Sequence, residues 1–275
     1  YAPYVPGWDT HGLPIEKKVQ QDKKITKDDV GITKFREICK EYALDAVERT
    51  AKQFERLGGL GDYRDKSKRY LTLNKDFEAK QIGVFGDMYK KGYIYRDLKP
   101  VYWCSDCETA LAEAEIEYKD DTSTSIYVKF KVQDDKDLFK SYVSLGNTYV
   151  VIWTTTPWTL PSNVALCVNP DETYVKVKTA DGYTYYLAEA LCDKILGGDK
   201  PTAPYEVVEK YIGKDLEGKE YEPLFDCAVE ICEKQHKKGY YVVCDNYVTL
   251  TDGTGVVHIA PAFGEDDAKV GRKYD

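Results

Sequence analysis

The chain has 275 residues, 43% of them hydrophobic and 31% charged, with a formal net charge of −8 at pH 7. This composition is typical of a globular protein with a substantial core and a charged surface. The acidic balance argues against a protein that grips nucleic acid mainly through its phosphates, because such proteins are usually basic. Any contact with nucleic acid should therefore be local or weak, or should need parts of a protein beyond this chain.

The sequence shows neither a membrane-spanning segment nor a signal peptide. No apolar stretch approaches the roughly 20 residues that span a bilayer, and the opening YAPYVPGW lacks the charged start and apolar run of a signal peptide. We therefore expect no membrane partner and a cytoplasmic location, although a start without Met indicates a fragment and leaves a lost targeting segment open. The eight cysteines include one close pair, Cys104 and Cys107, which fits a reducing compartment better than a secreted disulfide framework.

The first 118 residues are predicted to be mostly helical. After GWDTHGLPIE, where His11 is interpreted as a turn or capping histidine, Pro14 favours a short helix because proline fits the first helical turn. Residues 27–57 have helical spacing of apolar side chains and are followed by GGLG, which predicts one long helix. A further helix is predicted from Asn74, a good N-cap, to Lys91. We expect the apolar stripes of both long helices to make core contacts.

Cys104 and Cys107 have the spacing of half a zinc site, since two thiolates on one tight turn can share a metal at ~2.3 Å. A closed structural site needs four ligands, and the sequence has no second CxxC pair and no HxxxH motif. Cys227, Cys232 and Cys244 could complete the site only by an unusual arrangement. We therefore expect no metal site within this chain, with zinc bound at this half-site as the alternative.

From residue 119 the pattern changes to many short strands separated by turns. Asp181 and Gly182 form a hairpin turn between two of these strands. Such a pattern is typical of a small barrel or barrel-like sheet, and we place a domain boundary between residues 118 and 119. The predicted fold class is α+β, with a mostly helical segment 1–118 and a barrel-like domain 119–275. The predicted strands are 126–132, 174–177, 183–187, 205–211 and 240–244.

The stretch from Val151 to Leu166, VIWTTTPWTLPSNVAL, begins as a buried strand and ends in a shaped loop. Pro157 and Pro161 require the loop because each removes a backbone donor and fixes φ. The loop offers hydroxyls and backbone groups but no charge, which suits a pocket that holds a small polar group. The alternative interpretation is a plain strand end, since threonine is a common strand residue.

The last stretch, DGTGVVHIAPAFGEDDAKVG, predicts a tight turn, a buried strand from Val256 to Ile259 and a helix from Glu265. Asp267 then falls in the first helical turn, where the helix dipole stabilises a carboxylate. Two structural interpretations stay open at this point. Asp267 could be ordinary charge at the start of a helix, and His258 could be a core histidine with no catalytic role.

Four segments of the chain occur in the order found in one family: GWDTHGLPIE, WCSDCETALAEAEIEY, WTTTPWTLPSN and GTGVVHIAPAFGEDD. Together they resemble isoleucyl-tRNA synthetase, a class I enzyme, and the resemblance covers residues 1–275. The segment from about 170 to 250 carries little motif of its own. The related valine and leucine enzymes typically have TTRP in the threonine-rich loop, where this chain has Thr156, Pro157 and Trp158. The GEDD ending also favours the isoleucine branch over the valine branch.

The resemblance implies a fragment of a longer enzyme. Residues 1–118 would come from the class I catalytic domain around an insertion, and residues 119–275 would be the inserted editing domain, called CP1. The family's ATP-binding HIGH and KMSKS motifs do not occur in the sequence, so no synthetic activity is expected, and ATP and Mg would belong to the parent enzyme. The remaining chemistry would be deacylation of the tRNA(Ile) 3′ end carrying valine, and of valyl-adenylate or other valine-like substrates, by a monomer without a cofactor.

The resemblance also implies a role for each site residue. Asp267 would pair with the α-ammonium of the substrate, and His258 would lie beside its side chain or the terminal ribose in a positioning role, with general base as the weaker alternative. A different class of function remains open, namely a module that binds aminoacylated tRNA with little or no hydrolysis. The implied catalytic residues are Asp267, Thr155, Thr156 and His258, and the implied substrate-binding residues are Thr154, Thr159, Asn163 and Trp158.

Overall fold

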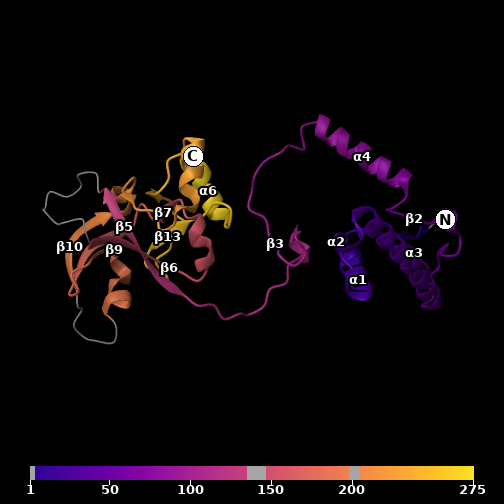
Figure 1. Cartoon of the computed structure of the whole chain (residues 1–275), viewed down its shortest axis with the longest axis horizontal. Coiled ribbons are helices and arrows are strands. Elements are labelled where there is room, and N and C mark those ends of the chain that lie inside the picture. The colour runs from indigo at the N-terminus through magenta and orange to yellow at the C-terminus, as the bar shows by residue number, and fades with distance from the viewer. Residues whose placement is uncertain (1–3, 135–146, 198–204) are drawn as a thin grey trace. The chain divides into compact units, whose positions relative to one another are not determined.

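The computed structural model describes residues 4–134, 147–197 and 205–275, and it divides into two compact units (Figure 1). The first unit is Tyr1–Asp97 and the second is Leu98–Asp275. The second unit therefore begins earlier than residue 119, since it includes residues 98–118. A functional boundary at 118/119, between catalytic and editing segments, stays a prediction.

Helices dominate the first unit, as predicted. Its helices are α1 (Leu13–Lys23), α2 (Lys27–Val30), α3 (Ile32–Arg56) and α4 (Lys75–Lys90), and a short parallel pair joins β1 (Gly7–Trp8) to β2 (Tyr70–Leu71). The prediction of one unbroken helix over residues 27–57 is wrong at Gly31, whose φ of 80° interrupts it. Thr26 instead closes a capping box on α2 with Asp29, which ties up the backbone donors at the start of that helix.

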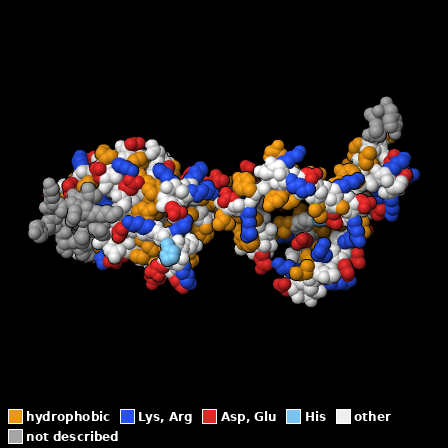
Figure 2. All heavy atoms as spheres, turned by 90° about the horizontal axis from the view of Figure 1, so that it is seen from above, with side chains coloured by type: hydrophobic (Ala, Val, Ile, Leu, Met, Phe, Trp, Pro, Cys, Tyr) orange, Lys and Arg blue, Asp and Glu red, His pale blue; other side chains and the backbone are white. Residues whose placement is uncertain are grey.

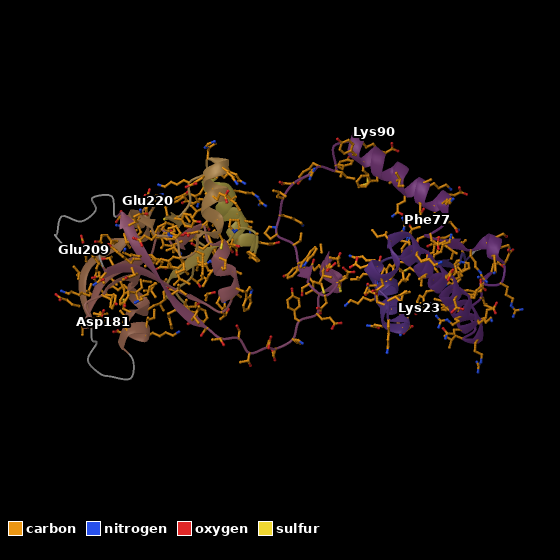
Figure 3. The ribbon with its side chains drawn as sticks, in the orientation of Figure 1. Lys23, Phe77, Lys90, Asp181, Glu209 and Glu220 are labelled. Atoms are coloured by element: carbon orange, nitrogen blue, oxygen red, sulfur yellow. The ribbon has the colours of Figure 1, made fainter. Side chains whose placement is uncertain are left out.

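The apolar stripes of the two long helices differ in burial. On α3, Phe35 and Val47 are buried, as expected for core contacts. The same expectation is wrong for α4, which has no buried residue in the described part of the chain and exposes Ile82 and Phe85. Figure 3 labels Phe77 near the start of α4, and its ring stacks on Tyr70 with centroids 5.6 Å apart.

A mixed sheet organises the second unit. In the described residues it has nine strands in the order β10-β8-β9-β6-β5-β11-β12-β7-β13. A separate ribbon pairs β3 (Trp103–Cys104) with β4 (Thr109–Ala110). The strands of the large sheet are β5 (Ile126–Asp134), β6 (Thr148–Thr154), β7 (Ala165–Val168), β8 (Thr173–Thr179), β9 (Thr184–Ala188), β10 (Tyr205–Ile212), β11 (Glu220–Tyr221), β12 (Tyr241–Cys244) and β13 (Val256–Ile259).

Mixed helix and sheet content matches the predicted α+β class, but closure into a barrel is not confirmed. The end strands β10 and β13 are not paired with each other in the described ranges, so the sheet stays open. Strands β13 and β6 nevertheless lie in contact without pairing, which brings the two ends of the threonine-rich stretch and the last strand together. The helices α5 (Val229–Gln235) and α6 (Glu265–Tyr274) complete the unit.

Tyrosines fill much of the core between these strands. Tyr174, Tyr186 and Tyr221 are each at most 1% exposed. Tyr174 shows how a buried phenol is satisfied, since it accepts from the Asn169 N–H at 2.9 Å and donates to the Gly255 carbonyl at 2.6 Å. That pair of bonds ties the start of β8 to the turn before β13, and therefore fixes the strand that carries His258.

Replacing Tyr174 with Phe should lower the free energy of unfolding of the second unit by about 1–3 kcal/mol, because two backbone groups lose a buried partner. Urea unfolding followed by tryptophan fluorescence measures this change. Tyr127→Phe is the matched control, since Tyr127 is 54% exposed and should be nearly neutral. Equal stability of the two variants would contradict the structural role of the Tyr174 hydroxyl.

Candidate active site

The threonine-rich loop is held by its own hydrogen bonds. Strand β6 ends at Thr154, and the short helix η4 (Pro157–Ser162) follows. The buried Thr154 hydroxyl accepts from the Thr156 N–H at 3.1 Å, and the Thr159 hydroxyl donates to the Thr156 carbonyl at 2.9 Å. These bonds occupy the backbone of Thr156 and leave its side chain, like that of Thr155, exposed. The loop therefore presents two hydroxyls on a fixed backbone.

Asn163 braces the far end of this loop. It is 3% exposed, its Nδ2 donates to the Ala165 carbonyl at 2.8 Å, and its Oδ1 accepts from the Tyr221 hydroxyl at 2.7 Å. Tyr221 is itself buried edge-on against the rings of Phe130 and Tyr240. Because both ends of the Asn163 amide bond within the chain, the structure gives Asn163 a bracing position rather than an open binding position.

His258 reaches the loop through strand pairing. Strands β13 and β7 are antiparallel with His258 opposite Leu166, and this register places the His258 Nε2 2.9 Å from the Thr159 hydroxyl. A threonine hydroxyl has one proton, and that of Thr159 is donated to the Thr156 carbonyl. The Thr159 oxygen must then accept from the imidazole, so we assign the neutral ring a proton on Nε2 and a lone pair on Nδ1.

The charge state of His258 follows from its burial. The side chain is 8% exposed, and desolvation lowers the pKa of the imidazole below its ordinary value, with Asp267 acting in the opposite direction. The Nδ1 atom is buried and has no hydrogen-bond partner in the described parts of the chain. A neutral histidine whose Nε2 is bonded to Thr159 fits a positioning role better than a role as a proton donor or acceptor at pH 7.

Asp267 lies in the first turn of α6, as predicted, and is half-buried. Its Oδ1 accepts from the Ala260 N–H at 2.8 Å, just past the end of β13. The other end of α6 is fixed by Tyr274, whose hydroxyl donates to Glu217 at 2.6 Å and accepts from the Cys244 N–H at 3.0 Å. The helix therefore holds the Asp267 carboxylate beside the strand that carries His258.

The structure thus connects most of the predicted site. Thr154, Thr156, Thr159 and His258 form one chain of hydrogen-bonding groups, with Asp267 coupled electrostatically to His258. Trp158 lies on η4 with 65% of its surface exposed. Sequence reasoning missed Tyr221 and Ala260. Tyr221 lies in the motif-poor segment, and Ala260 contributes only a backbone N–H, so neither has a local signal.

The cysteines do not assemble a ligand set. Cys104 ends β3 and Cys107 lies in the turn before β4, whereas Cys244 is buried in β12 with its pKa raised to about 11 by burial. Among the residues that the structure describes, no group of three or more His, Cys, Asp or Glu side chains could hold a metal ion. Zinc at Cys104 and Cys107 stays an untested alternative.

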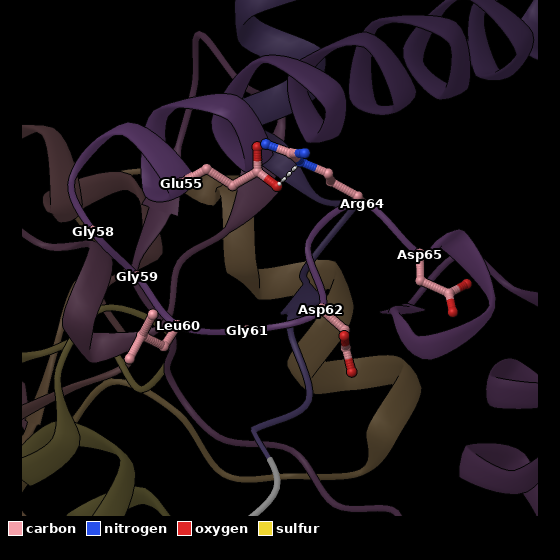
Figure 4. Close-up of a pocket in the computed structure, with 8 residues that line it drawn as sticks. All are labelled: Glu55, Gly58, Gly59, Leu60, Gly61, Asp62, Arg64 and Asp65. Atoms are coloured by element: carbon pink, nitrogen blue, oxygen red, sulfur yellow. Dashed lines mark hydrogen bonds and ion pairs between the residues drawn. The ribbon is translucent and has the colours of Figure 1, made fainter.

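Two surface hollows are formed by residues of the first unit. One, of about 380 Å³, follows α3 at the GGLG turn, and its lining includes Glu55, which accepts from Arg64 at 2.9 Å (Figure 4). The other, of about 410 Å³, lies at the start of α4 beside Tyr70 and Phe77. Neither is lined by the threonine-rich loop, His258 or Asp267, so these two hollows are not part of the candidate site.

Comparison with known proteins identifies the class. The sequence profile described as tRNA synthetases class I (I, L, M and V) matches residues 1–257, and the chain belongs to this family. It is 49% identical over 275 residues to the isoleucine–tRNA ligase of Thermoanaerobacter sp. (strain X514), and 47% identical to that of Caldanaerobacter subterraneus subsp. tengcongensis. Each alignment covers 99% of this chain but 28% of the relative, so the chain spans about 28% of the length of these enzymes. The predicted resemblance to isoleucyl-tRNA synthetases is confirmed.

Among solved structures, the P. knowlesi cytosolic leucyl-tRNA synthetase editing domain is similar with a TM-score of 0.41 and 16% identity, covering 55% of this chain and 65% of that one. This likeness is too distant to support an argument about the site. In the described ranges, none of the helices has the length and apolar character needed to cross a membrane.

The low pKa of His258 predicts a pH dependence of stability. Because the folded-state pKa lies below the unfolded value of about 6.5, the unfolded state binds a proton first as pH falls. The stability is therefore full above about pH 6.5 and declines from there down to the folded pKa. Urea unfolding between pH 7.5 and 5 should show a steeper loss for the wild type than for His258→Gln.

The same variant assigns the imidazole signal by its disappearance from the NMR spectrum. The His258 ring should titrate below the ordinary histidine value. A ring that titrates at or above that value, or identical pH slopes for wild type and His258→Gln, would show that burial does not control this residue.

Proposed function

We propose that this chain carries the editing site of an isoleucyl-tRNA synthetase and hydrolyses valine from the 3′ end of tRNA(Ile). The observation that carries the proposal is the hydrogen-bonded chain from Thr156 through Thr159 to His258, with Asp267 fixed at the end of the same strand. The near 50% identity to isoleucine–tRNA ligases over the whole chain supports the isoleucine branch. The barrel-like form of the editing domain belongs to this proposal.

Editing is needed because isoleucine and valine differ by one methylene. A hydrophobic pocket gains only about 1–3 kcal/mol from that group, and the isoleucine enzyme is itself the standard example of this limit. A second site that admits valine and excludes isoleucine by size removes the errors that the first site makes. The threonine loop suits this task, since residues 154–163 carry no charged side chain and the backbone is fixed by its own bonds.

Asp267 supplies the charge that the loop lacks. One carboxylate oxygen is bonded to the Ala260 N–H, and the α-ammonium of an aminoacyl ester would pair with the remaining acceptor capacity. His258 and Thr159 would form the wall beside the substrate. Because its Nε2 donates to Thr159, His258 orients groups in this proposal and does not need to take a proton through that atom.

The hydrolytic step is an ester cleavage by water. Water adds to the ester carbonyl carbon, the bond to the ribose oxygen breaks, that oxygen takes a proton, and valine leaves. The exposed hydroxyls of Thr155 and Thr156 are donors that can stabilise the oxyanion, which is the largest catalytic term in many acyl transfers. The protein would hold ester and water in place, and this positioning needs no cofactor.

A second candidate function is a module that binds aminoacylated tRNA without turning it over. The net charge of −8 gives the chain little electrostatic attraction for the phosphate backbone, so its affinity for tRNA should be weak when it acts alone. Synthesis of isoleucyl-tRNA with ATP and Mg would belong to the longer enzyme. A cytoplasmic location and a monomeric state are further parts of the proposal.

Single-turnover deacylation of valyl-tRNA(Ile) at high protein concentration separates the two candidates. The chain should release valine faster than buffer alone, and Asp267→Ala should slow this release by roughly 10- to 150-fold, because a charge-assisted bond contributes about 1.5–3 kcal/mol. Asp266→Ala is the matched control, since Asp266 is exposed and pairs with Lys269 at 3.0 Å. Binding without valine release by the wild type would establish the module instead.

The threonine loop should set the size limit. Thr156→Ser removes a methyl but keeps the hydroxyl and the backbone groups that hold the loop, so hydrolysis of isoleucyl-tRNA(Ile) should rise by about tenfold, the value of one methylene. Thr156→Ala separates size from oxyanion stabilisation, since it also removes the hydroxyl and should therefore show a smaller rise. If isoleucyl-tRNA(Ile) stays intact with both variants, Thr156 does not provide the steric limit.

A further inference from the structure

Gly264, the residue before α6, has no conformational need to be glycine. Its φ of −146° and ψ of 147° are extended values that any residue adopts. Aspartate, asparagine and serine are the best residues at this N-cap position, because their side chains bond the free N–H groups of the first turn, and glycine ranks close behind them with threonine. Backbone geometry and helix capping therefore accept glycine at this position, but neither of them requires it.

The reason lies in the space above its Cα. A Cβ atom added to Gly264 would lie 2.2 Å from Oδ2 of Asp267 and 3.0 Å from its Cγ. Real Cβ atoms essentially never come closer than 3.0 Å to another heavy atom, so any side chain at 264 must displace the carboxylate. Asp267 thus occupies the volume that a side chain at residue 264 would fill.

The Asp267 carboxylate is consequently fixed at both oxygens. Oδ1 accepts from the Ala260 N–H at 2.8 Å, and Oδ2 rests against the bare Cα of Gly264. In an ordinary capping box the third residue of the helix bonds back to the N-cap N–H. In α6 this third residue is Asp267, and it bonds the N–H of Ala260 instead of the N–H of Gly264. Because Ala260 lies two residues after His258, this bond links α6 to strand β13.

We propose that Gly264 is a positioning residue whose missing side chain sets the orientation of the Asp267 carboxylate for the substrate ammonium. The inference rests on the proposed function for its consequence in catalysis. The placement of Asp267 by Gly264 does not depend on any activity. A side chain at 264 moves the carboxylate, breaks its bond to Ala260 and removes the fixed partner of the ammonium, although the backbone needs no change.

Hydrogen exchange of the Ala260 amide, measured by NMR on the 275-residue chain, tests the placement without an activity assay. The amide should be protected in the wild type and should lose protection in Gly264→Ala and in Asp267→Ala. Gly83→Ala is the control, because a Cβ there meets nothing within 4 Å. Unchanged protection of Ala260 in Gly264→Ala overturns the proposal whether or not the chain hydrolyses esters.

A double-mutant cycle tests whether Gly264 acts through Asp267 alone. Gly264→Ala should lower Tm more in the wild type than in the Asp267→Ala background, where no carboxylate remains to be displaced and only the weaker N-capping of alanine acts. Equal Tm losses in both backgrounds would mean that the methyl disturbs something other than Asp267, and the proposal fails.

The catalytic consequence is read from valyl-tRNA(Ile) hydrolysis. Gly264→Ala and Gly264→Ser should each slow it at least tenfold, even though serine is the better N-cap and plain helix capping predicts no loss. Wild-type rates in Gly264→Ser overturn the positioning role and leave the proposed function standing. If the wild type itself releases no valine, the proposed function fails, and the Ala260 amide and the Tm cycle still decide whether Gly264 places Asp267.

Discussion

The hydrogen bond between Thr159 and His258 joins two parts of the chain that are 99 residues apart, and the site depends on it. It forms because β13 pairs with β7, which begins three residues after η4. The same pairing carries Ala260, the partner of Asp267, to the end of the strand. One register therefore sets the loop, the imidazole and the carboxylate together, and a slip by one residue would turn His258 to the opposite face.

Buried polar groups keep this arrangement rigid. A buried amide or hydroxyl without a partner costs free energy, so each one restricts the conformations that its neighbours can adopt. Asn163 has partners at both ends of its amide, and the partner at one end is the phenol of a buried tyrosine. The loop thus gains its shape from satisfied bonds rather than from packing alone, which leaves the exposed hydroxyls of Thr155 and Thr156 in defined positions.

The sequence predicts the local features of this site well and the long-range ones poorly. Proline spacing indicated the loop after β6, and the GEDD segment indicated a carboxylate in the first turn of α6, because both signals lie within a few residues. Tyr221 and the partners of β7 left no such signal, since strand pairing is set by residues far apart in the chain. The long N-terminal helix broke at Gly31 because a positive φ there overrides helical spacing on either side. The exposed stripe of α4 shows that periodicity predicts a helix but not what covers it.

The charge of this chain bears on what the proposed editing site has to do by itself. Figure 2 shows acidic and basic side chains interspersed over the face in view, and the net charge of −8 leaves little general attraction for phosphates. In the proposed function, a site that tests the size of an amino acid does not need such attraction, because its substrate would arrive covalently attached to a nucleic acid that other parts can hold. Such a site needs one fixed carboxylate opposite an uncharged wall. The carboxylate would hold the substrate ammonium in one position, so that only the size of the amino-acid side chain decides whether the substrate fits. In the proposed function, the bond from Ala260 to Asp267 and the bare Cα of Gly264 would provide that fixed point, and the threonine loop would provide the wall.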